Sequence, residues 1–94
     1  MVRIAVVTLR LHAPWVHSLK EKRRVVKSIL AKVRNKFQAS AAEAADQDVH
    51  QSIVIAVASI AAHSAQADGI MDEIVRFVEQ NTEAEIVGEE REIR

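Results

Sequence analysis

The stretch that decides the fold is residues 2–37, VRIAVVTLRLHAPWVHSLKEKRRVVKSILAKVRNKF. Val2–His12 is rich in Val, Ile and Leu, and every second residue along its middle is apolar, which predicts a strand with one core face. Ser18 and Glu21 have the spacing of a capping box, so a helix is expected to begin there. Apolar residues then recur at helical spacing, which predicts that the helix continues to about Phe37 with one face on a core.

The rest of the chain predicts a hairpin, a second helix and a final strand. Ala39–Ala45 is a run of small residues, and Ser52–Ile60 is a β-branched strand candidate. Asp46–Asp48 supplies turn residues between them, so the two segments form a predicted β-hairpin. A helix capped by Ser64 is expected to end near Asn81, and Glu85–Ile93 is expected to form a charged edge strand.

The order strand, helix, strand, strand, helix, strand is that of the α+β ferredoxin-like split βαβ fold (βαββαβ). It predicts a four-stranded antiparallel sheet with two helices on one face and the other face open. The chain has 94 residues, so residues 1–94 are expected to form a single ferredoxin-like domain with one modest core and little room for a deep pocket.

The zero net charge conceals a strong segregation. Residues 1–37 carry ten cations and one anion, a net charge of +9, while residues 38–94 carry a net charge of −9. Such asymmetry indicates either a polyanionic partner for the basic part or association of the basic part of one copy with the acidic part of another.

Several motifs are similar to those of a known family. They are Ser-Leu-Lys-Glu-Lys-Arg-Arg-Val-Val-Lys-Ser at 18–28, Arg-Asn-Lys-Phe at 34–37, and further matches between Ser40 and Gln51. In these motifs the chain resembles the YlxP-like family of small bacterial proteins, a domain family of unknown function. The resemblance implies a ferredoxin-like fold. It also implies a role near RNA or the ribosome, because the family's genes often lie among those for translation initiation and ribosome maturation.

The first predicted helix carries a continuous basic stripe. Five cations fall within one arc of roughly 100° on a helical wheel and would neutralise successive phosphates of RNA. The alternatives are a solvated face, or pairing with acids of the second helix (Asp68, Asp72, Glu73, Glu79) in the same or a second molecule. The candidate nucleic-acid-binding residues are Lys20, Arg23, Arg24, Lys27 and Arg34.

The open sheet face is predicted to be apolar and free of aromatic residues. Without aromatics to stack on bases, this face does not fit RNA binding of the kind that other sheets of this topology use. A homodimer that buries the face is the favoured interpretation, and solvation by Arg3 and Arg10 is the alternative. The candidate dimer-interface residues are Ile4, Val6, Val54 and Ala56.

No motif for catalysis is present, so the chain is not expected to be an enzyme or to carry a cofactor or small-molecule substrate. It has no Cys, and its two glycines build no phosphate-binding loop. Glu43, Asp46, Asp48 and His50 would hold a divalent metal if the chain were extended there, but turn capping is favoured and no metal is predicted. Trp15 is expected to cover one end of the core rather than stack on a base.

These observations predict a cytoplasmic, non-catalytic protein that associates with RNA or the ribosome through its first helix. The absence of Cys fits a reducing compartment, and the N-terminal apolar run is broken by charges, so neither a signal peptide nor a membrane span is expected. The alternative function is a homodimeric structural or adaptor module that makes protein contacts through the open sheet face. His63, which precedes the second helix, is expected only to be solvated.

Overall fold

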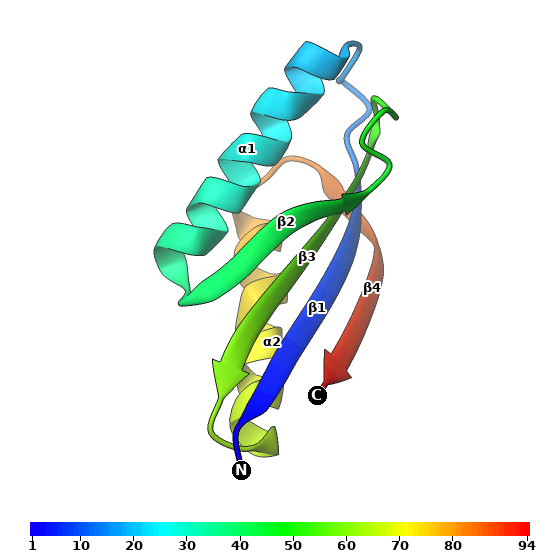
Figure 1. Cartoon of the computed structure of the whole chain (residues 1–94). Helices are drawn as coiled ribbons and strands as arrows, with labels where there is room; N and C mark the ends of the chain where they lie inside the picture. The colour runs from blue at the N-terminus through cyan, green and yellow to red at the C-terminus, as the bar shows by residue number, and fades with distance from the viewer.

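Strands and helices alternate in the predicted order in a computed structural model that describes all 94 residues (Figure 1). The predicted α+β ferredoxin-like fold is confirmed, and every predicted boundary lies within two residues of the observed one. The elements are β1 (Arg3–His12), α1 (Leu19–Lys36), β2 (Ala39–Ala45), β3 (Ser52–Ala61), α2 (Ser64–Gln80) and β4 (Glu85–Ile93).

The four strands form one antiparallel sheet in the order β2-β3-β1-β4. In β1 the odd residues from Ala5 to Leu11 are fully buried and face the two helices. As Figure 1 shows, α2 runs behind the centre of the sheet while α1 lies along β2, so the two helices diverge and touch each other little. The opposite face of the sheet carries no element of this chain.

The predicted capping box begins α1. The Ser18 hydroxyl accepts a hydrogen bond from the Glu21 backbone N–H at 3.1 Å. The Glu21 carboxylate reaches back one residue beyond the cap and accepts from the His17 N–H at 2.8 Å. The first bond satisfies one free N–H group of the helix end, and the second fixes the residue that precedes the cap.

The sequence-based prediction for the start of α2 is wrong about which residue caps the helix and about the role of His63. The cap is His63 and not Ser64: the His63 ring Nδ1 accepts from the Gln66 N–H at 3.2 Å. The Gln66 side chain accepts in turn from the Ala62 N–H at 2.5 Å. His63 therefore has a structural role, because it satisfies a helix N–H that would otherwise lack a partner.

The loop between β1 and α1 closes one end of the core. Ala13 and Val16 are fully buried there, whereas Trp15 keeps 36% of its surface exposed. The fully buried residues at this end of the core are therefore Ala13 and Val16, and Trp15 lies at its edge, partly exposed. At the other end, Phe37 and Phe77 pack edge to face with ring centroids 5.5 Å apart.

Neither helix combines the length and the apolar composition that crossing a bilayer requires.

Candidate nucleic-acid interface

The outward face of α1 is a continuous basic surface. The neighbouring side of this helix buries Val26, Ile29, Leu30 and Val33 in the core, which fixes the rotation of the helix about its axis. The helix is unbroken over its 18 residues, so the stripe is not divided by a kink. Four of its cations are exposed along this face and are named the α1 basic face below: Lys20, Arg23, Arg24 and Lys27.

None of these four cations makes an ion pair in the chain. Of the ten cations in residues 1–37, only Arg10 and Lys22 have an acidic partner. Asp72 of α2 pairs instead with Arg91 of β4 at 2.5 Å. The alternative in which the stripe pairs with α2 acids of the same molecule is therefore wrong.

The fifth predicted residue of the stripe, Arg34, makes a hydrogen bond within the fold. Its guanidinium donates a hydrogen bond to the backbone carbonyl of Ala41 in β2. This contact draws Arg34 toward the sheet edge and away from the four cations nearer the start of the helix. The Arg34 guanidinium is therefore less free to contact a partner molecule than the four cations of the α1 basic face.

Lys22 is a charged residue of the core that sequence reasoning counted only as one more cation. Its side chain is 1% exposed, its ammonium donates to the Asp46 backbone carbonyl, and it lies 3.1 Å from Glu43 Oε2. The contact with Glu43 is an ion pair rather than a well-aligned hydrogen bond, because Oε2 is buried without a hydrogen-bond partner. The signal was present in the sequence, since Lys22 lies between Ile29 and Val33 on the helical wheel.

The β2–β3 turn is organised by hydrogen bonds to the Asp46 carboxylate. Asp46 has a φ of 57°, and its carboxylate accepts from the Ser52 hydroxyl at 2.8 Å and from Arg10 at 2.6 Å. These bonds, the one from Ser52 first, hold the pKa of Asp46 below its usual value of 3.8. The segment is a turn and not an extended chain, and no three His, Asp or Glu side chains group where a metal ion could sit.

The open sheet face has its apolar surface at one end. Ile4 and Ile60 are register partners on β1 and β3 and are 42% and 71% exposed. Val6 and Ala56 are half-buried, but Val54 is only 5% exposed within a single chain and offers almost no surface to a partner. Ile60, which the prediction omitted, replaces Val54 as the largest apolar contribution to this face.

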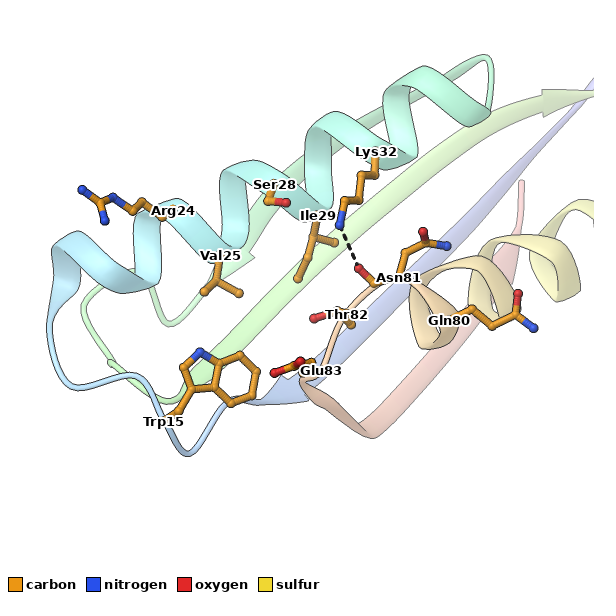
Figure 2. A pocket seen from close by; sticks show the side chains of 10 residues that line it. All are labelled: Trp15, Arg24, Val25, Ser28, Ile29, Lys32, Gln80, Asn81, Thr82 and Glu83. Atoms are coloured by element: carbon orange, nitrogen blue, oxygen red, sulfur yellow. Dashed lines mark hydrogen bonds between the residues drawn. The ribbon is translucent and has the colours of Figure 1, made fainter.

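An open groove of about 560 Å³ lies between α1 and the α2–β4 connection (Figure 2). Trp15 reaches into it from the β1–α1 loop, below Val25 of α1 and beside Glu83. Arg24 belongs both to this groove and to the α1 basic face, so the two surfaces are continuous. Across the groove, the Lys32 ammonium donates to the Asn81 carbonyl at 3.2 Å and ties α1 to the end of α2.

Comparison with known proteins agrees with the motifs quoted above. Residues 4–91, which include part of every helix and strand, match the model of a family described as "Protein of unknown function (DUF503)". The chain is also 35% identical over 68 residues to the uncharacterized protein YlxP of Bacillus subtilis (strain 168), which covers 72% of this chain and 74% of that protein. The chain therefore belongs to the DUF503 family of proteins of unknown function.

Proposed function

We propose that this protein is a non-catalytic RNA-binding module that docks on structured RNA through the α1 basic face. The observation that carries the proposal is a row of four exposed cations on one helix face without an acidic partner in the chain. Successive phosphates of an RNA strand are the ligand that such a row fits, because each cation displaces a condensed counterion.

The arrangement has a cost that supports a functional reading. Lys20, Arg23, Arg24 and Lys27 form four pairs at spacings of three or four residues, and each such like-charge pair destabilises a helix by a few tenths of a kcal/mol. A polyanion removes that repulsion when it binds. The family resemblance, with its implied place near translation, favours RNA as the polyanion.

The test is a charge reversal on the α1 basic face. The variant Arg23→Glu, Arg24→Glu, Lys27→Glu is compared with the wild type for binding to a structured RNA and to ribosomal subunits over a salt series. We expect wild-type affinity to fall steeply with salt and the variant to lose binding, while its far-ultraviolet circular dichroism stays unchanged.

A matched control separates the helix face from net charge. Arg3→Glu, Arg76→Glu, Arg94→Glu changes the charge of the chain by the same amount but leaves α1 intact. We expect this control to retain most of its RNA affinity at moderate salt. Equal loss in both variants, or no wild-type binding at low salt, would contradict the proposal.

A second candidate function is a homodimeric adaptor module that buries the open sheet face. The exposed pair of Ile4 and Ile60 favours it, because apolar residues that adjoin on a sheet face are characteristic of contact surfaces. A second copy is the partner proposed here, packed face to face about a two-fold axis. Sedimentation velocity at micromolar concentration tests this candidate, and a monomer would count against it.

A further inference from the structure

The groove beside the α1 basic face presents an aromatic ring that the fold does not need for its core. Trp15 is the only tryptophan of the chain, and its indole extends over the groove instead of into the apolar interior (Figure 2). Pockets that bind small ligands have roughly 300–1,000 Å³. The groove, at about 560 Å³, is therefore large enough for a single nucleotide base and its sugar.

The loop that carries Trp15 is held in place on both sides of the ring. Gln51 of the β2–β3 turn donates from its side-chain amide to the carbonyls of Pro14, at 2.9 Å, and Val16, at 3.3 Å. The Gln51 carbonyl also accepts from the Ala13 N–H at 2.9 Å. When a ligand stacks on a ring that the protein already holds in place, little conformational entropy is lost on binding. Trp15 is therefore a preorganised stacking surface.

We propose that this groove receives one unpaired base of the bound RNA, stacked on the Trp15 indole. This inference rests on the proposed function. Val25 and Ile29 supply apolar contacts beside the ring. Arg24 lines the groove and also belongs to the α1 basic face, and its guanidinium points outward from the groove (Figure 2). The phosphate of the same nucleotide would lie on that outer side and join the row of phosphates along the helix. The ligand is thus a structured RNA with an unpaired nucleotide beside a paired stem.

The carboxylate that lies beside the Trp15 ring favours a guanine. Lys32, Asn81 and Thr82 already make hydrogen bonds within the chain. The Glu83 carboxylate makes none and lies beside the indole edge, where it offers two acceptor oxygens. Guanine presents adjacent N1–H and N2–H₂ donors to such a carboxylate, whereas uracil places a carbonyl on each side of its single N–H.

Intrinsic tryptophan fluorescence measures the stacking of a base on Trp15 directly. Because the chain has one tryptophan and no tyrosine, its emission reports Trp15 alone. The probes are three labelled RNA hairpins that are fully paired, that carry one unpaired G in the stem, or that carry one unpaired U at the same place. We expect the unpaired G to quench the emission most, and to bind about tenfold more tightly than the paired hairpin, as expected for one stacked base.

Two variants assign the preference to the named residues. Trp15→Leu is expected to remove the advantage of the unpaired G while it leaves the affinity for the paired hairpin unchanged. Glu83→Gln is expected to narrow the difference between G and U, because the amide offers one acceptor and one donor in place of two acceptors.

The outcomes separate this inference from the proposed function. Salt-sensitive binding of all three hairpins with equal affinity and no change in Trp15 emission would overturn the base-binding groove and leave the α1 basic face standing. No binding of any hairpin at low salt would overturn both. Equal quenching by the G and U hairpins, unaltered in Glu83→Gln, would contradict the guanine preference.

Discussion

At the scale of single residues, Lys22 differs from the other cations of α1 because the fold encloses it. A buried ammonium is tolerated only when charges and carbonyls replace its water. Glu43 and the Asp46 carbonyl do so here, and both come from the β2–β3 hairpin. Lys22 therefore joins α1 to the turn, and that turn also holds Arg10 through the Asp46 carboxylate.

Lys22→Met is expected to destabilise the protein by about 2–3 kcal/mol, since it leaves the Glu43 carboxylate and the Asp46 carbonyl without their partner. Glu43→Gln in the same chain is expected to recover part of this loss, because no unpaired charge then remains. Urea unfolding measures both effects. The control Lys20→Met, at an exposed site, should change stability by less than about 0.5 kcal/mol, and an equal effect of the two lysine variants would contradict this role of Lys22.

Asp46 gives the molecule a dependence on acid pH. Its pKa in the folded chain lies below the ordinary value of 3.8, so its contribution to stability is present above 3.8 and is lost as the pH falls through the folded-state pKa. We expect the wild type to be more stable than Asp46→Asn near neutral pH, and the difference to shrink well below pH 3.8. Unfolding midpoints over a pH series provide the measurement.

Two features make this pH test specific. Asparagine tolerates the positive φ of position 46, so Asp46→Asn changes the charge with little backbone strain. Ser52→Ala removes the hydrogen bond that lowers the pKa of Asp46 most, so the loss of stability at acid pH should be smaller in that variant and should level off at a higher pH. A wild type and an Asp46→Asn variant with parallel pH profiles would refute the argument.

At the scale of elements, α1 combines a stable buried face with an exposed face of repelling charges. Replacing Arg23, Arg24 and Lys27 with Gln removes all four like-charge pairs and keeps helix propensity nearly constant. We expect the variant to be more stable than the wild type by about 1 kcal/mol at low salt, and the gain to vanish near 1 M salt, where charges are screened over about 3 Å.

Urea unfolding at both salt concentrations measures this gain, and RNA binding of the same variant should be lost. A stabilised protein that no longer binds is the result expected when a surface is kept for function at a cost in stability. A gain that persists at high salt would show that repulsion is not its cause.

Local patterns in the sequence predicted the helices and strands more completely than the candidate binding sites. The alternation of β1 and the capping box at Ser18 were sufficient because each depends on neighbours within a few residues. The His63 cap was missed because imidazole is an uncommon acceptor at that position. Burial of Lys22, and the groove that pairs Trp15 with Glu83, depend on segments far apart in the chain, which periodicity does not bring together.

At the scale of the whole molecule, the sheet separates the two proposed surfaces. The helices cover one face, so the α1 basic face and the Trp15 groove lie on that side, while Ile4 and Ile60 lie on the other (Figure 1). A face-to-face dimer would therefore place two α1 helices on opposite outer sides of the assembly. Neither surface needs to change when the other is occupied.

This separation predicts that dimerisation and RNA binding are independent. Ile4→Ser, Ile60→Ser removes apolar surface without changing charge, so we expect this variant to be a monomer by sedimentation velocity at micromolar concentration and the wild type to be a dimer. Its affinity for an RNA hairpin short enough to reach only one α1 helix should stay within about twofold of the wild type, since distant sites act additively.

The converse variant changes the α1 basic face and keeps the open sheet face. Charge reversal at Arg23, Arg24 and Lys27 should abolish RNA binding and leave the dimer intact, because α1 lies on the far side of the sheet from Ile4 and Ile60. A longer RNA that reaches both helices of a dimer should bind the wild type more tightly than the Ile4→Ser, Ile60→Ser variant, because the second contact is then intramolecular. Loss of short-hairpin binding in the monomeric variant would instead mean that the two surfaces form one site.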